Sequence, residues 1–326
     1  MSDDVVTGVS GYSFAPPDLN PAQRREGISA FMRIKNGAEF LEATIRSHID
    51  EVDEIVAVFN NCTDATETIL RTMRAEYGPK LRIFHYQDRV FPPGSEGHKT
   101  TDPSSPHSIV NYSNFALAQT KCTIVTKLDD DHLAIEQPWR ALARQARQNL
   151  RQDQLLAFSG INLIHPKGQL SAEPQVLLNA PISGKGDIGF FRISDESFFH
   201  HDPRFERFAK NRSTRQFGAF TYWHLKFLKR DVYGNYELAE NPNSRFARLR
   251  DRLDDFDSMP FDRWLRKAGK PRPWRSLMAA MVDKEAIARD QRRQLRAGRL
   301  RETPAKAMLR LSSLQNLSSS SLGPAP

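Results

Sequence analysis

The first 130 residues alternate short apolar runs with segments of helical periodicity. The apolar runs are 28–34, 54–59, 81–86 and 123–128. Between the first two, Leu41, Ile45 and Ile49 recur at the spacing of one helix face. Parallel strands need long crossovers, which are usually helices, so this alternation predicts an α/β fold with a mostly parallel sheet flanked by helices.

Three consecutive carboxylates, Asp129, Asp130 and Asp131, follow the fourth run directly. Adjacent carboxylates repel one another, and a hard divalent cation such as Mn²⁺ or Mg²⁺ removes that repulsion. Ligands of open α/β sheets bind at the carboxyl ends of the strands, which is where this triplet lies. A metal site that holds substrate phosphates is one interpretation, and a solvated acidic turn is the other.

Polar turns also follow the first two runs. Asn36-Gly37 leads into the first predicted helix, and Asn60 opens the turn after 54–59. Asp64, with Glu67 three residues later, resembles a capping box that begins the second helix. We therefore expect several polar side chains at one edge of the sheet.

The order of these motifs resembles that of the family-2 glycosyltransferases, which are nucleotide-sugar-dependent enzymes with the GT-A fold. Residues 28–41 are similar to the opening motif of that family, and 54–66 are similar to its second motif. Asn114 matches an Asn that precedes the strand bearing the Asp-x-Asp motif, and 129–131 match Asp-x-Asp itself. The resemblance covers about residues 28–132 well and residues 183–235 loosely.

The resemblance implies a GT-A-type, Rossmann-like sheet and a divalent metal held by Asp129 and Asp131. It also implies a cleft for the nucleotide-sugar donor. The residues expected around the donor are Arg33, Asn36, Asn60, Asp64, Asn114, Asp129 and Asp130. The implied acceptor is a glycan or a lipid-linked glycan, as in bacterial-type synthesis of cell-surface polysaccharides.

Two positions depart from the family pattern. Phe59 stands where the family commonly has a carboxylate that helps to hold the nucleotide, so it either stacks on the ligand or packs in the core. Tyr222-Trp223-His224 stands where a Glu-Asp pair usually supplies the catalytic base. An inverting transfer, which we favour, needs such a base.

Asp187, between two glycines, is our first candidate for the missing base. Four further carboxylates are candidates as well: Asp195, Glu196, Asp202 and Glu206. His224 is a second catalytic candidate and could instead complete the metal shell. Because Phe220, Trp223 and Phe227 recur at helical spacing, the sequence predicts a partly buried helix around His224. His132 is expected to shape the metal loop.

The composition and the pattern of apolar residues indicate the cellular compartment of the protein. Its two cysteines, Cys62 and Cys122, do not form a disulfide framework and fit a reducing cytoplasm. Residues 1–27 lack the pattern of a signal peptide, and no apolar run reaches the roughly 20 residues that cross a bilayer. The predicted organisation is an N-terminal extension (1–27), a GT-A catalytic domain (28–235), a helical region (236–311) and a disordered tail (312–326).

The net charge of +8 is concentrated near the C-terminus. Residues 284–310 contain nine Lys and Arg against three acids, a net charge of +6. A basic helical segment can lie on an anionic membrane surface, which would make the protein peripheral at the inner face of the membrane. It could equally be a solvated helix packed on the catalytic domain. A nucleic-acid-binding segment is disfavoured, because no nucleic-acid-binding motif accompanies it.

Two further functional classes remain open from the sequence. One is a metal-dependent nucleotidyl- or phosphotransferase, which also needs acidic residues at a strand end. The other is a non-catalytic descendant that binds a nucleotide or a membrane, which Phe59 and the missing Glu-Asp pair would explain.

Overall fold

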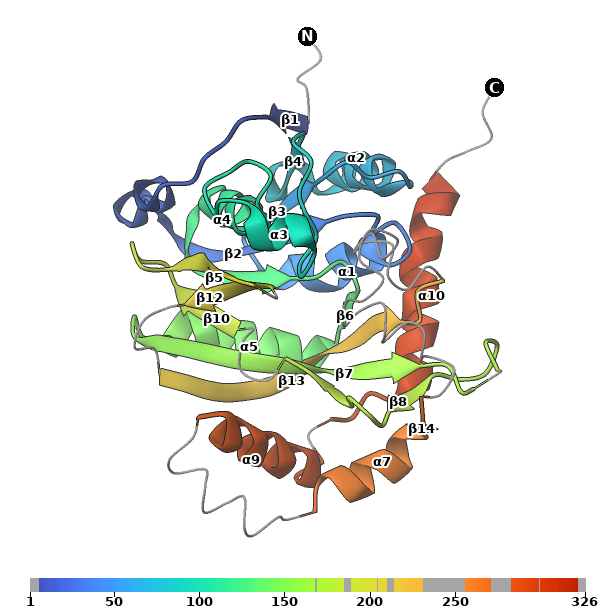
Figure 1. Cartoon of the computed structure of the whole chain (residues 1–326). Coiled ribbons are helices and arrows are strands. Elements are labelled where there is room, and N and C mark those ends of the chain that lie inside the picture. Colours follow the sequence, from blue (N-terminus) through green and yellow to red (C-terminus); the bar gives the residue numbers. More distant parts are fainter. Residues whose placement is uncertain are drawn as a thin grey trace, which may run out of the picture.

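The computed structural model of the chain is drawn in Figure 1. The residues that it describes are 6–167, 169–184, 189–203, 205–209, 214–230, 256–270, 283–298 and 300–321. Asp187, the first candidate for the catalytic base, lies outside these residues, as does the predicted domain boundary at 235.

A 12-stranded mixed sheet runs through the described part of the chain, in the order β1-β4-β3-β2-β5-β10-β7-β13-β6. Off this path, β8 and β9 pair with β7, and β14 pairs with β8. A separate hairpin is formed by β11 and β12. The strands are β1 (Val6–Val9), β2 (Arg25–Ile34), β3 (Glu54–Phe59), β4 (Leu81–Tyr86), β5 (Cys122–Leu128), β6 (His132–Ala134), β7 (Gln154–Ile164), β8 (Gln175–Leu177), β9 (Ile182–Ser183), β10 (Gly189–Arg192), β11 (Phe198–Asp202), β12 (Phe205–Ala209), β13 (Thr214–Phe227) and β14 (Ser258–Met259).

Pairing from β1 through β4, β3 and β2 to β5 is parallel throughout, while β10 lies antiparallel between β5 and β7. The longest parallel pair of the second half joins β7 to β13. The predicted α/β class with a mostly parallel central sheet is therefore confirmed. Parallel pairing of β2 with β3 and with β5 places the carboxyl ends of these three strands at one edge.

Helices cover both faces of this sheet, as the GT-A-type expectation requires (Figure 1). The α-helices are α1 (Leu41–His48), α2 (Thr66–Tyr77), α3 (Glu96–Thr100), α4 (Ile109–Ala118), α5 (Glu136–Asn149), α7 (Phe261–Ala268), α9 (Asp283–Arg296) and α10 (Pro304–Ser321). Single 3-10 turns are η1 (Pro16–Leu19), η2 (Pro21–Gln23), η3 (Ile49–Glu51) and η4 (Gly78–Lys80).

The alternation of side chains along β2 explains the layers. Met32 and Ile34 face α1, α2 and α5, whereas Phe31 beside Met32 faces α4. A third core cluster joins β6, β7 and β13 to α7, α9 and α10, where Trp223 and Trp264 are buried. The C-terminal helices therefore pack on the second half of the sheet.

The helix predicted around His224 is wrong, because residues 214–227 form strand β13. Its register against β7 shifts between Phe217 and Ala219, between Phe220 and Tyr222, and again after His224. Each irregularity breaks the two-residue alternation of a strand, so the apolar residues acquire a spacing that imitates a helix.

The disordered tail predicted for 312–326 is also corrected in part, since helix α10 continues through Ser321. Leu311 is buried and Leu314 packs on the same cluster, while the Gln315 side chain donates to the carbonyl oxygen of Glu39 (2.7 Å). At the other end, Val6–Val9 adds a strand beside β4, so part of the predicted N-terminal extension belongs to the sheet. Among the described helices, none is long and apolar enough to cross a membrane.

Candidate metal and nucleotide site

The acidic triplet lies at the carboxyl edge of the parallel strands. Met32 in β2 pairs with Leu128, the last residue of β5, and Ile34 pairs with Phe59 at the end of β3. A side chain at Gly37 would clash with the Asp130 carboxylate, so glycine is what lets the turn before α1 approach the triplet. The sheet topology thus places the predicted metal loop among the predicted nucleotide residues.

Asp131 and His224 form the most specific pair in this region. The Nε2 atom of His224, on β13, lies 3.2 Å from Oδ1 of Asp131, yet this buried Oδ1 has no hydrogen-bond donor. The other ring nitrogen, Nδ1, lies 2.5 Å from Oδ1 of Asn162. The amide nitrogen of Asn162 donates to the carbonyl of Ala180 (2.5 Å), which fixes the amide orientation and leaves its oxygen facing the imidazole.

An amide oxygen only accepts, so Nδ1 of His224 donates to Asn162, and Nε2 is the ring atom that faces Asp131. Either a proton on Nε2 or a metal ion between the two atoms accounts for a ring nitrogen and a carboxylate oxygen this close together. Ligands about 2.1 Å from a divalent ion and at right angles would be separated by about 3.0 Å, close to the 3.2 Å observed. This geometry fits a divalent metal held by Asp131 and His224, with Asn162 orienting the imidazole.

His132 completes a group of three. One ligand atom from each of Asp131, His132 and His224 lies within 4.8 Å of the others. The His132 ring stacks on Tyr222 (3.7 Å between centroids), and both of its buried nitrogens lack a hydrogen-bond partner. Burial lowers the pKa of His132 to about 3, so the imidazole is neutral and has a lone pair to offer.

Lys229, just after β13, forms ion pairs with Asp130 and Asp131. Its Nζ lies 3.1 Å from Asp130 and 3.0 Å from Oδ2 of Asp131, and all three side chains are buried. Burial raises the pKa of Asp130 to about 6, although Lys229 opposes that shift. Burial would also raise the pKa of Asp131, but the Lys229 charge holds it well below its usual range. Asp131 therefore keeps Oδ2 on lysine and Oδ1 toward His224.

Asp129, the second predicted metal ligand, lies outside the group of three. One carboxylate oxygen pairs with Lys127 and the other is 3.6 Å from Nε2 of His132. Burial would raise the pKa of Asp129, whereas Lys127 and His132 lower it below its usual range. Asp129 is thus ionised beside the metal candidates, a position from which it can reach a donor group or the ion.

Two predicted nucleotide residues hold the turns at this edge. Asn36 has positive φ (52°), and its side-chain oxygen accepts from the backbone of Thr63 (2.8 Å). The Asn60 amide donates to the carbonyls of Tyr86 and Asp88, both at 2.7 Å. These contacts fix loop geometry; a donor contact by either residue stays a prediction.

Asp64 joins the loop after β3 to the loop after β2. Its carboxylate accepts from the backbone of Thr66 (3.0 Å) and of Ala38 (2.9 Å). The start of helix α2 shows no side-chain cap, so the predicted capping box is replaced by this bridge. The bridge keeps the ends of the two strands together.

Arg33 and Asn114 face the β11–β12 hairpin. The guanidinium of Arg33 pairs with Glu206 and donates to Ser113 (2.7 Å). Asn114 exchanges two hydrogen bonds with the backbone of Phe199, at 2.7 and 3.0 Å. Glu206, one of the candidate bases, is therefore engaged by Arg33. The candidate bases Asp195 and Glu196 are exposed.

Phe59, which replaces the usual carboxylate, stacks on His85 (4.5 Å between centroids, 9° between planes) and is only 2 % exposed. The core interpretation of this residue is therefore correct. Sequence reasoning missed two other residues, Lys229 and Asn162. Neither belongs to a motif, and only the pairing of β13 with β7 and β6 brings them to the acids.

Comparison with known proteins gives a likeness among solved structures. No model of a known protein family matches the chain, and no curated protein matches it. The chain is similar to S. aureus TarS 1-349, with 14 % identity over 91 % of this chain and 93 % of that chain and a TM-score of 0.33.

The chain is also similar to glucosyl-3-phosphoglycerate synthase from Mycobacterium tuberculosis in complex with Mg²⁺ and uridine-diphosphate. The identity is 17 % over 48 % of this chain, with a TM-score of 0.29. This chain spans half (50 %) of the length of that synthase structure.

Proposed function

We propose that this protein is a divalent-metal-dependent glycosyltransferase of the GT-A type that takes its sugar from a nucleotide-sugar donor. The proposal rests on one observation: Asp131 Oδ1 and His224 Nε2 face each other, 3.2 Å apart, at the carboxyl edge of parallel strands. The order of the motifs along 28–132 adds the donor class.

In this proposal Asp131 and His224 hold Mn²⁺ or Mg²⁺, and His132 lies close enough to contribute. When bound, such an ion neutralises the charge that develops on a departing diphosphate. Lys229 keeps Asp130 and Asp131 from repelling each other, and Asn162 keeps Nε2 of His224 directed at the site. Asp129 and Asp130, with the turns of Asn36 and Asn60, frame the donor.

We assign the base of an inverting transfer to Asp187, whose place between glycines would let an acceptor hydroxyl approach closely. The acceptor class that fits the resemblance is a glycan or lipid-linked glycan. The basic segment 284–310 would hold the enzyme on an anionic membrane surface near such an acceptor. Sedimentation with anionic liposomes at low and high salt tests that last element, since screening must release the protein.

A thermal-shift screen tests the central proposal. Nucleoside diphosphates and nucleotide-sugars are added with and without Mn²⁺, to wild type and to His224→Gln. At 100 times the dissociation constant, one ligand should raise the melting temperature by about 2 °C or more, in wild type with Mn²⁺ only.

No stabilisation of wild type by any nucleotide at saturating Mn²⁺ would refute the proposal. Product analysis then separates the reaction classes. Release of nucleoside diphosphate from the donor supports glycosyl transfer, whereas release of pyrophosphate identifies a nucleotidyltransferase.

A further inference from the structure

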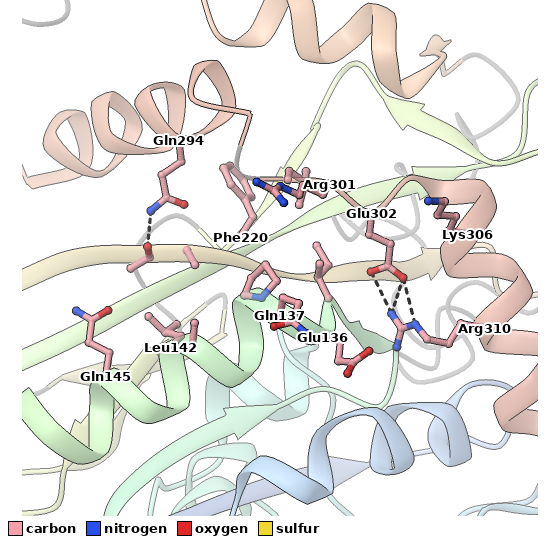
Figure 2. Close-up of a pocket in the computed structure, with 16 residues that line it drawn as sticks. Glu136, Gln137, Leu142, Gln145, Phe220, Gln294, Arg301, Glu302, Lys306 and Arg310 are labelled. Atoms are coloured by element: carbon pink, nitrogen blue, oxygen red, sulfur yellow. Dashed lines mark hydrogen bonds and ion pairs between the residues drawn. The ribbon is translucent and has the colours of Figure 1, made fainter.

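A cleft among the described residues lies away from the acidic triplet. It has a volume of about 900 Å³, within the range of small-molecule sites, and it is bounded by α5, β13, α9, α10 and the segment before α10 (Figure 2). None of Asp131, His132 and His224 lines it. The cleft is therefore a second site, separate from the one proposed to hold the metal.

The floor of the cleft is apolar. Leu142 on α5, Phe220 on β13 and Leu300 line it, and each is at most 7 % exposed. Ile135, Ala141 and Ala219 extend the same surface. An apolar ligand segment placed here would lose contact with water without leaving a buried polar group unpaired.

Several polar groups of the cleft already have partners. Glu302 accepts from Arg310 at 2.9 Å and from the indole nitrogen of Trp223 at 3.3 Å, and Gln294 donates to the carbonyl of Gly218. Glu136 lies 3.5 Å from Arg140. Figure 2 shows the Glu302–Arg310 pair at one end of the cleft and Gln294 at the other.

Two cationic side chains of the lining have no partner among the described residues. Arg301 and Lys306 are exposed, and within the described ranges neither side chain forms an ion pair or a hydrogen bond. Both lie in the half of the cleft that contains Glu302, with Arg301 beside Phe220 (Figure 2). The cleft therefore combines an apolar floor with two unpaired positive charges at its rim.

We propose that this cleft binds a single-chain anionic amphiphile, whose phosphate or carboxylate head lies between Arg301 and Lys306 and whose apolar part lies over Leu142 and Phe220. Nucleic acid fits this chemistry poorly, because its uniform charge would leave the apolar floor unmatched. The inference does not depend on the metal or on the proposed transferase activity.

Isothermal titration of the full chain with octyl phosphate, kept below its micelle concentration, tests the proposal. The double variant Arg301→Gln/Lys306→Gln should weaken binding about 10-fold, because two charge contacts near a surface are lost. The matched control, Arg263→Gln/Arg266→Gln on α7, removes the same charge from exposed residues outside both the cleft and the basic segment 284–310, and should stay within about twofold.

The two halves of the ligand are tested separately. Inorganic phosphate and 1-octanol should each bind at least about 10-fold more weakly than octyl phosphate, since each lacks one of the complementary groups. Vesicles containing phosphatidic acid show whether the head can also come from a bilayer lipid; loss of vesicle binding in the cleft variant alone supports that source. Absence of octyl phosphate binding, equal affinity in the two double variants, or equal affinity for inorganic phosphate would overturn the proposal.

Discussion

The acidic site and the amphiphile cleft share strand β13 but have opposite designs. At the acidic site, Asp130, Asp131 and Lys229 are buried against one another, and the space that matters is a gap of 3.2 Å between two atoms. In the cleft, about 900 Å³ is open and the charges of Arg301 and Lys306 reach solvent. The close approach of polar atoms at the acidic site thus indicates a reactive centre, whereas the volume of the cleft indicates only that a ligand fits there.

The strongest test of this difference between the two regions is to remove the buried charge of Lys229. Lys229→Met leaves Asp130 and Asp131 facing each other without compensation, so the free energy of unfolding should fall by about 3–5 kcal/mol. Added Mn²⁺ should restore part of the loss, because it supplies the missing charge. Urea unfolding with and without Mn²⁺ measures both effects.

Lys99→Met is the matched control for that variant. Lys99 forms an exposed pair with Glu96 (3.3 Å), so its loss should change stability by less than about 0.5 kcal/mol. If Lys229→Met proves equally mild, the acidic cluster is solvated and the contrast between the two regions fails.

The second prediction separates the two aspartates expected to bind metal. Asp131→Asn should lower Mn²⁺ affinity by at least about 100-fold, more than the loss of an outer-shell partner causes. Asp129→Asn should cost less than about 10-fold, because Asp129 lies outside the Asp131–His132–His224 group. Electron paramagnetic resonance of free Mn²⁺ gives both affinities, and equal losses would make Asp129 a direct ligand.

The third prediction concerns the loss of stability at low pH caused by His48, a residue that lies in neither the acidic site nor the cleft. Burial lowers the pKa of His48 to about 4, even though its ring donates to the Thr44 carbonyl (2.8 Å). As the pH falls, His48 of the unfolded chain takes up a proton before His48 of the folded chain does. The free energy of unfolding is therefore unaffected by His48 above about pH 6.5 and decreases by about 1.4 kcal/mol per pH unit from there toward pH 4.

His48→Asn retains a donor for Thr44 without the titration, so it should remove the His48 share of the slope, while buried His132, whose pKa is also lowered, keeps its own share. Urea unfolding between pH 4 and 7 measures it. A slope unchanged in the variant would place the acid sensitivity elsewhere, with buried His132 as the next candidate.

The smallest expected effect concerns the rim of the cleft. Glu302→Gln keeps the shape but weakens the bonds from Arg310 and Trp223, and a partly exposed pair of this kind should cost about 1 kcal/mol. Glu136→Gln, which alters a more exposed lining carboxylate, should be nearly neutral. Thermal unfolding distinguishes them, and equal melting temperatures would mean that the Glu302 pair adds nothing to packing.

Elements whose conformation depends on their own residues can be predicted from the sequence, whereas elements whose conformation depends on a distant partner cannot. The sequence predicts strands 54–59 and 81–86 with their observed ends. The first of them is buried along its whole length, and burial on both faces produces its almost continuous apolar run. The sequence predicts β13 wrongly, because the register shifts of that strand depend on β7, a partner that its own sequence does not encode.

The same distinction applies to the candidate site. Asp131 follows an obvious strand in sequence, and it lies at the strand end where the sequence predicts it. Lys229 and Asn162 complete its surroundings from 98 and 31 residues away in the chain, and only tertiary pairing brings them there. The cleft was equally hidden, since its lining comes from elements spread between 135 and 310.

The Arg310 side chain also donates to the carbonyl of Ala134, at the end of the three-residue strand β6 that begins directly after Asp131. The two residues are 176 positions apart in the chain. At a synthesis rate of about 5–20 residues per second, the ribosome makes Arg310 about 10–35 s after Ala134. The edge of the sheet that carries the acidic triplet can therefore form this contact only after 176 further residues have been synthesised.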